Sequence, residues 1–120
     1  MKKILVIEDN EEIRDNTSEV LELHDYEVIS APDGRDGIFM MEQNEVDLIL
    51  CDILMPNMTG YDVLHAAKQS EKTKSIPFVF MSASVEPKEI EEARKRGIEF
   101  FITKPFQIEK LLDTIEKALS

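Results

Sequence analysis

The chain has few of the residues that cross-link small proteins or anchor them in membranes. Of its 120 residues, only Cys51 is cysteine and none is tryptophan. A single cysteine excludes an internal disulfide framework and a cysteine-rich zinc site. No apolar run approaches the length of about 20 residues that a membrane-spanning helix requires. The apolar run at residues 4–7 is too short for a signal peptide and ends in an acidic stretch. We therefore expect a cytoplasmic protein.

Basic residues are also scarce. The chain has 14 lysines and arginines against 25 acidic residues, a net charge of −11. A surface of this sign repels phosphate backbones and anionic lipids, so we expect no direct contact with nucleic acid or membrane. The charge does not exclude small cations. The length suits one domain, and we predict a single domain over residues 1–120.

Short apolar runs alternate with longer amphipathic segments along the whole chain. The runs are too continuous for strands with one solvent-exposed face, and they are typical of a parallel sheet that helices cover on both faces. They lie at residues 4–7, 46–50, 78–81 and 100–102, with a weaker run at 27–30.

Helices are predicted between these runs from capping residues and apolar periodicity. Asn10 suits the N-cap of the first helix, and Thr59 with Asp62 resembles a capping box. A further helix begins near Pro87 and stops at Gly97. An apolar stripe at helical spacing covers residues 108–119.

The segment 33–44 is the weakest helix prediction, because Gly34 and Gly37 lower helix propensity. With this segment included, the order is strand and helix repeated five times. Such alternation predicts a doubly wound α/β fold with a parallel sheet and right-handed crossovers.

Charged and hydroxyl residues follow directly after the apolar runs. Glu8 and Asp9 follow the first, Asp52 the third, Ser82 the fourth and Lys104 the fifth. Each has an ordinary local explanation, such as a helix terminus, a turn or a solvated charge. In an open α/β sheet, however, ligands bind beyond the C-terminal ends of the strands, where all these residues are expected to meet.

Three carboxylates at one edge imply a cation. Two carboxylates about 5 Å apart repel by roughly 3 kcal/mol at an effective dielectric constant of about 20. Oxygen ligands favour a hard ion such as Mg²⁺, and a lysine suits a phosphoryl oxygen. A carboxylate can also be a nucleophile that forms an aspartyl-phosphate. These residues therefore suggest a Mg²⁺-assisted phosphoryl-acceptor site centred on Asp52.

The order and spacing of these pieces resemble the receiver domain of two-component response regulators, in particular chemotaxis-regulator-like stand-alone receivers. The matching segments are ILVIEDNEEIR, DLILCDILMPNMTGYDVL, IPFVFMSAS and ITKPF. The resemblance covers the chain from end to end. It implies a (βα)5 flavodoxin-like fold whose five parallel strands lie in the order 2-1-3-4-5.

The resemblance also implies roles for individual residues. Asp52 would accept a phosphoryl group from a sensor histidine kinase or phosphotransfer protein. Mg²⁺ would be the one cofactor, held by Glu8, Asp9, Asp52 and the backbone carbonyl of Leu54. Lys104 would pair with the phosphoryl oxygens. The peptide bond before Pro105 is commonly cis in this family.

A switch is implied as well. Ser82 would turn toward the phosphoryl group, and Phe101 would then move inward and remodel the face of helix 4, strand 5 and helix 5 for a downstream protein partner. Phe101 stands where tyrosine is commoner, so a hydroxyl that could fix the inward state is missing. Gly37 replaces a typical alanine and is expected to loosen the second helix. Leu54 and Ser84 occupy variable positions beside the site.

Other functions remain as alternatives. A haloacid-dehalogenase-like phosphatase would need an acid two positions after Asp52, where Leu54 stands, and a flavodoxin-like electron carrier would need a phosphate loop at residues 8–12. A receiver-like interaction module or a phosphorelay intermediate without its own output is also open. We expect a regulatory protein rather than an enzyme, a monomer or weak dimer, acting as a stand-alone unit.

Overall fold

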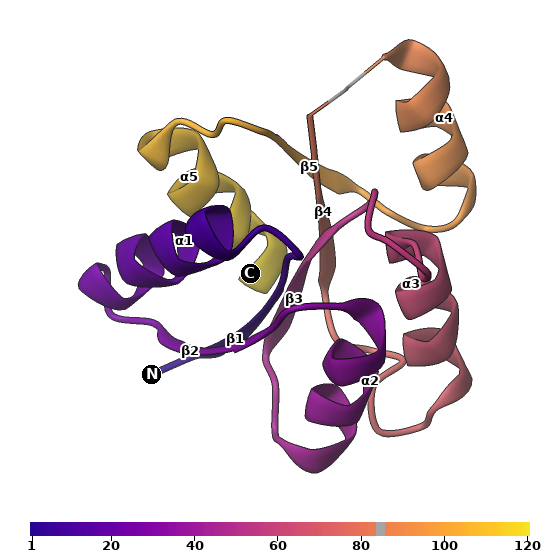
Figure 1. Ribbon diagram of the computed structural model, residues 1–120, viewed down its shortest axis with the longest axis horizontal. Coiled ribbons are helices and arrows are strands. Elements are labelled where there is room, and N and C mark those ends of the chain that lie inside the picture. The colour runs from indigo at the N-terminus through magenta and orange to yellow at the C-terminus, as the bar shows by residue number, and fades with distance from the viewer. Residues whose placement is uncertain (84–85) are drawn as a thin grey trace.

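The computed structural model describes residues 1–83 and 86–120, which form an alternation of strands and helices (Figure 1). The strands are β1 (Lys3–Ile7), β2 (Glu27–Ala31), β3 (Leu48–Asp52), β4 (Phe78–Ser82) and β5 (Phe100–Thr103). The helices are α1 (Glu11–Leu23), α2 (Gly34–Gln43), α3 (Gly60–Gln69), α4 (Pro87–Lys95) and α5 (Ile108–Leu119). Within these ranges, the predicted alternation is confirmed.

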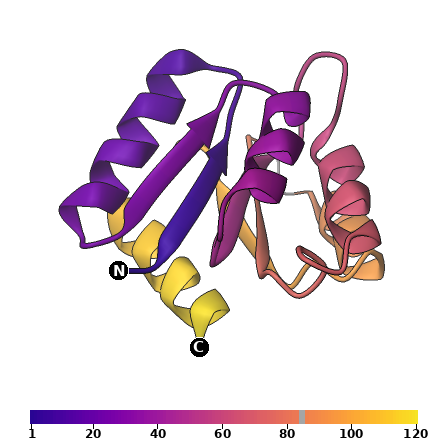
Figure 2. The same cartoon turned by 90° about the horizontal axis from the view of Figure 1, so that it is seen from below.

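All strand pairs are parallel, and the strands lie in the order β2-β1-β3-β4-β5. Helices α1 and α5 cover one face of the sheet, and α2, α3 and α4 cover the other (Figures 1 and 2). A buried apolar cluster lies on each face. The doubly wound fold and the expected strand order are therefore confirmed.

The predicted helix boundaries follow from local hydrogen bonds. The Asn10 side chain accepts a hydrogen bond from the Ile13 amide at 3.0 Å and caps α1. Thr59 and Asp62 form both halves of a capping box at the start of α3. Gly97 has φ of 91°, the left-handed conformation that ends a helix, just after α4.

Helix α2 forms despite its glycines, and the reason lies in packing. A Cβ atom added at Gly37 would collide with the side chain of Ile7 in β1, and one at Gly34 would lie 2.7 Å from the Met58 sulfur. Both glycines let α2 approach the sheet and the loop before α3. The expectation that Gly37 loosens this helix stays a prediction, and the structure adds that the missing side chain allows close packing.

Strand β3 begins two residues later than the apolar run predicted, and this shift matters for the site. Val46 is buried but precedes the strand, so its apolar character reflects core packing. The strand extends to Asp52, which is therefore the last paired residue of a central strand.

In the described part of the chain, no helix is long and apolar enough to cross a membrane.

Candidate functional site

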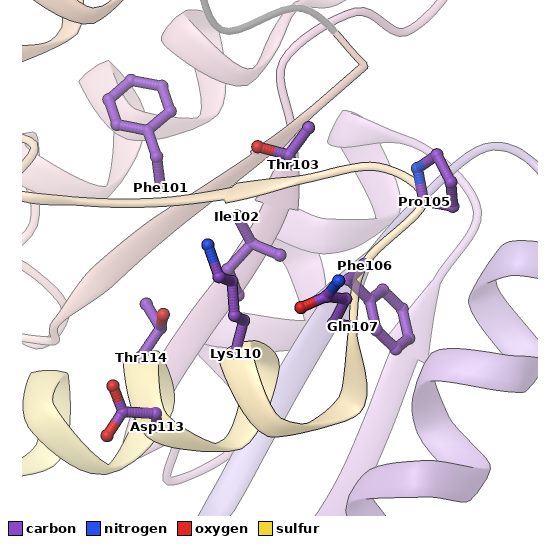
Figure 3. A pocket seen from close by; sticks show the side chains of 9 residues that line it. All are labelled: Phe101, Ile102, Thr103, Pro105, Phe106, Gln107, Lys110, Asp113 and Thr114. Carbon is purple, nitrogen blue, oxygen red and sulfur yellow. The ribbon is translucent and has the colours of Figure 1, made fainter.

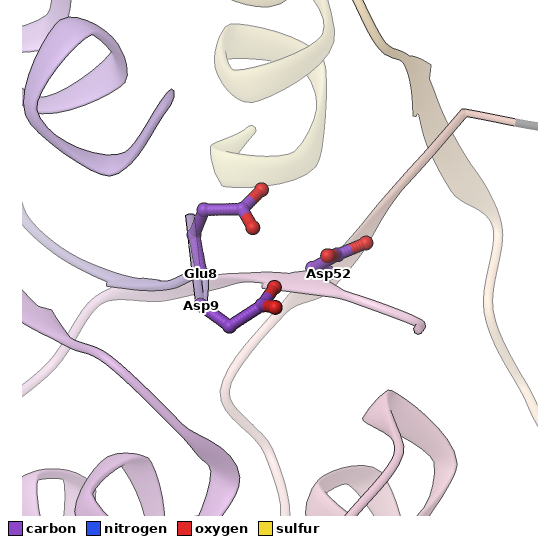
Figure 4. Close-up of side chains that lie close together, drawn as sticks. All are labelled: Glu8, Asp9 and Asp52. Carbon is purple, nitrogen blue, oxygen red and sulfur yellow. The ribbon is translucent and has the colours of Figure 1, made fainter. Parts of the chain in front are cut away.

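Three carboxylates lie together at the C-terminal ends of β1 and β3 (Figure 4). One carboxylate oxygen each from Glu8, Asp9 and Asp52 lies within 4.8 Å of the others. Glu8 and Asp52 are buried, with 0% and 4% of their surface exposed, whereas Asp9 is exposed to solvent. The predicted convergence of the three acids is confirmed.

Lys104 reaches this cluster from the end of β5. Its Nζ lies 2.8 Å from a Glu8 carboxylate oxygen and 3.1 Å from one of Asp52. The Lys104 side chain is itself mostly buried, at 13% exposure. The following peptide bond, Lys104–Pro105, is cis, as the resemblance implied. One ammonium group thus bridges the ends of β1 and β3 from a third strand.

Burial and charge act in opposite directions on these groups. Burial is the largest influence on Glu8 and Asp52, and it raises the pKa of both carboxyls although Lys104 opposes the shift. Burial also opposes the charge of Lys104, but the hydrogen bonds that its ammonium donates to Glu8 and Asp52 outweigh burial and raise the pKa of the ammonium. Lys104 therefore attracts both carboxylates, but this attraction does not offset the cost of burying their charges, and the pKa values of Glu8 and Asp52 stay raised.

The end of β3 is fixed by its neighbours. The Ile53 amide donates to the Met81 carbonyl at 3.1 Å, and the Gly60 amide donates to the Ile53 carbonyl at 2.8 Å. A Cβ atom at position 60 would lie 2.6 Å from the Asp52 carbonyl oxygen. Gly60 therefore allows the first turn of α3 to pack directly on the backbone that carries Asp52. The sequence showed only a glycine after an N-cap and gave no sign of this contact.

Glu8 is held by more groups than the sequence indicated. Its second carboxylate oxygen accepts a hydrogen bond from the Asn10 amide at 3.1 Å, and its own amide donates to the Ala31 carbonyl at 3.1 Å. The Arg14 guanidinium donates to the Glu8 carbonyl at 3.0 Å. Arg14 was not among the predicted site residues, since an arginine in an amphipathic helix is usually read as surface.

The other predicted residues lie around this cluster. Ser82 is buried at the end of β4, and its carbonyl accepts the Lys104 amide at 2.8 Å. Leu54 follows β3 and is 69% exposed, which places it at the rim of the site. Phe101 lies in β5, which β4 separates from the strand that carries Asp52. Ser84 lies outside the described residues.

Phe101 packs against the core cluster on the α3 side of the sheet. Its ring meets Phe80 edge-on, with centroids 6.1 Å apart, and Phe80 meets Tyr61 at 5.1 Å. Phe101 and Ile102 point to opposite sides of β5 (Figure 3). A pocket of about 480 Å³ opens between β5 and α5, lined by residues of both elements, among them Ile102, Phe106, Lys110 and Asp113.

The donor set fits a hard divalent cation. Three carboxylates at this spacing supply only oxygen ligands, as Mg²⁺ requires. Both Glu8 oxygens already have partners in Lys104 and Asn10, whereas the exposed Asp9 carboxylate is accessible from solvent. This arrangement favours direct ligation by Asp9 and Asp52, with Glu8 acting through water.

Comparisons with known proteins agree with this geometry. Residues 4–116 match the family model described as the response regulator receiver domain. The CAI-1 autoinducer sensor kinase/phosphatase CqsS of Vibrio cholerae is 36% identical over 95% of this chain, which spans 17% of the length of CqsS. Protein PilH of Pseudomonas aeruginosa is 28% identical over all of this chain and 99% of its own length.

Solved structures show the same similarity in three dimensions. The chemotaxis protein CheY4 of Vibrio cholerae superposes with a TM-score of 0.94 at 31% identity, over 99% of each chain. The similarity therefore includes all five strands and the strand ends that carry the acidic cluster and the lysine.

Proposed function

The chain belongs to the response regulator receiver domain family, and from this premise we propose that it is a phosphorylation switch centred on Asp52. The family places the protein in CheY-like two-component signalling and gives it a regulatory role. The single observation that carries the finer proposal is the convergence of Glu8, Asp9, Asp52 and Lys104 from three strand ends.

In the proposed reaction, a carboxylate oxygen of Asp52 attacks the phosphorus atom of a phosphohistidine. A P–O bond forms as the P–N bond breaks, and the imidazole leaves with a proton from solvent. The product is an acyl phosphate on Asp52. Asp52 suits this role because it ends a central strand and is held in place by the packing of Gly60 and the β4 ladder.

The other residues have complementary roles. Bound Mg²⁺ would neutralise charge on the phosphoryl oxygens, and Asp9, Asp52, the Leu54 carbonyl and a water held by Glu8 would hold it. Lys104 would exchange part of its present pairing with Asp52 for a phosphoryl oxygen, since its ammonium already lies 3.1 Å from that carboxylate. The Lys104 ammonium also lies 2.8 Å from a Glu8 carboxylate oxygen, which would hold it close to Asp52. The lysine would therefore need little movement to reach a phosphoryl oxygen.

The output is proposed to run through Ser82 and Phe101. Ser82 would turn toward the phosphoryl group, and Phe101 would move farther inward against Phe80, which its ring already contacts. The face of α4, β5 and α5 would then bind its protein partner differently. The pocket beside β5 and α5 supports this proposal, because it adjoins the β5 segment that carries Phe101.

The remaining parts of the proposal concern context. The upstream partner is a sensor histidine kinase or phosphotransfer protein, and the protein acts in the cytoplasm as one receiver domain, monomeric or weakly dimeric. Phosphorylation and dephosphorylation of its own Asp52 would be its only catalysed reactions. A phosphate-independent interaction module is the competing function, and the phosphorylation experiment separates the two.

The test is intact-mass measurement after incubation with Mg²⁺ and acetyl phosphate. We expect the mass of one added phosphoryl group, stable in acid and lost in base. Asp52→Asn should abolish the adduct, whereas Asp113→Asn, a matched change at an exposed aspartate of α5, should keep it. No adduct on the unmodified chain, or an adduct that persists in Asp52→Asn, would refute the proposal.

A further inference from the structure

Arg14 lies in the first turns of α1, outside the cluster of acids, and contacts it only through the backbone. Its guanidinium NH1 donates a hydrogen bond to the carbonyl of Glu8 at 3.0 Å, in a partly buried position. That carbonyl belongs to the peptide unit that joins Glu8 to Asp9. Arg14 therefore contacts the peptide unit from which the second acid projects.

The two acids differ in how they are held. The Glu8 carboxylate has Lys104 on one oxygen and the Asn10 amide on the other, so its position does not depend on Arg14. Among the residues that the structure describes, no lysine or arginine forms an ion pair with Asp9. Asp9 interacts with the Glu8 side chain, and since none of these cations holds its carboxylate, its direction depends on the backbone that carries it.

From these contacts we infer that Arg14 is a positioning residue for the cation site, which aims the Asp9 carboxylate at Asp52 by fixing the Glu8–Asp9 peptide. The inference rests on the proposed function, because it assumes that the acidic cluster binds Mg²⁺. Its physical basis is that partners behind a metal ligand restrict the ligand to its binding orientation, and their loss typically weakens metal affinity about 10–100-fold.

Charge and positioning predict opposite effects, which makes the inference testable. If Arg14 acted only as a nearby positive charge, its removal would lessen repulsion and Mg²⁺ would bind more tightly. If Arg14 positions Asp9, its removal leaves the carboxylate free to turn into solvent, and Mg²⁺ binds more weakly. The sign of the change therefore separates the two roles.

The experiment measures the Mg²⁺ dissociation constant of the unphosphorylated protein by isothermal titration calorimetry. We expect Arg14→Ala to weaken binding about tenfold. Arg14→Lys, which keeps a donor of shorter reach, should restore part of the affinity. Arg35→Ala removes the same charge from an exposed position in α2 and should leave the affinity unchanged. Far-UV circular dichroism and urea unfolding establish that each variant is folded.

A second comparison tests whether Arg14 acts through Asp9. In an Asp9→Asn background, the ligand that Arg14 positions is already weakened, so adding Arg14→Ala should change the affinity less than twofold. Tighter or unchanged binding in Arg14→Ala, or a full tenfold effect in both backgrounds, would overturn the inference. If Arg14→Ala does not fold, Arg14→Lys and Arg14→Gln are compared by the same criteria.

The proposed function can fail separately. If the unmodified chain binds no Mg²⁺ and takes no phosphoryl group, the proposed function is wrong. If it does both and Arg14→Ala binds Mg²⁺ as tightly as before, only the positioning role of Arg14 is wrong.

Discussion

Removing the charge of Lys104 should destabilise the protein when no cation is present. In Lys104→Met the side chain keeps a similar length and apolar volume but loses its ammonium group. Glu8 and Asp52 are buried and would then face each other without a positive partner in the described structure. The change is therefore a direct measure of how the acidic cluster is held in the fold.

The size of the effect follows from the distances. At an effective dielectric constant of about 20, the Lys104 ammonium attracts Glu8 at 2.8 Å by about 6 kcal/mol and Asp52 at 3.1 Å by about 5 kcal/mol. Repulsion between two carboxylates that lie within 4.8 Å of each other is at least about 3 kcal/mol on the same basis. Lys104 is thus the main favourable charge in the cluster.

Breaking a buried ion pair by removing one partner typically costs about 3–5 kcal/mol. We expect about 3 kcal/mol, at the lower end of that range, because the carboxyls can take up protons once Lys104 is gone. The assay is urea unfolding at pH 7.5 with a chelator, followed by far-UV circular dichroism since the chain has no tryptophan. Lys110→Met, at an exposed lysine of α5, is the control and should stay within about 0.5 kcal/mol of the unmodified chain.

The pH dependence checks the cause. The pKa values of Glu8 and Asp52 are raised in the fold, so their neutral forms are favoured there and stability decreases as pH rises through their titration. The pKa of Lys104 is also raised, so its contribution is complete at neutral pH and is lost only at strongly alkaline pH. The loss in free energy of unfolding that Lys104→Met causes should therefore become smaller toward pH 5. A loss below about 1 kcal/mol at pH 7.5, or a deficit independent of pH, would refute this reasoning.

Three further predictions follow from burial and packing. Asp52→Asn should stabilise the cation-free protein in urea unfolding, because burial and the charge of Asp9 disfavour the charged form while Lys104 keeps Glu8 as a partner; a loss of stability would contradict this. Gly37→Ala should destabilise by about 1–3 kcal/mol, since its Cβ would collide with Ile7, whereas helix propensity alone predicts a gain. Cys51 is fully buried and the pKa of its thiol is raised by burial, so a thiol reagent should modify it only as fast as the protein unfolds; rapid labelling of the folded chain would show that it is accessible.

Much of the fold could be predicted because its signals are local. The Asn10 cap, the Thr59 capping box and the stop at Gly97 each depend on residues within one turn, and the structure confirms all three. The start of β3 was wrong by two residues because Val46 is buried without being in the strand. Hydrophobicity reports burial, and it identifies a strand only where the two coincide.

The role of the glycines in α2 could not be predicted for a different reason. Helix propensity describes an isolated helix, and on that scale Gly37 is unfavourable. The distance between α2 and β1 depends on the side chain of Ile7, which lies 30 positions earlier in the chain and on another element. A propensity argument does not include that contact, so it could not show that close packing requires a glycine at this position.

At the site, the position of the strand ends could be predicted from the sequence, whereas the contacts of the long side chains could not. The parallel sheet brings the ends of β1, β3 and β5 to one edge, which is why Glu8, Asp52 and Lys104 could be predicted to meet. The sequence could not show that a single ammonium group would contact both acids, nor that Arg14 would bind the Glu8 carbonyl. These contacts depend on the reach of long side chains, between residues 96 positions apart for Lys104 and Glu8 and six positions apart for Arg14 and Glu8. Placing acids at neighbouring strand ends therefore determines where a cation can bind, whereas Lys104 and the backbone contacts of Glu8 determine which carboxylate oxygens remain available to it.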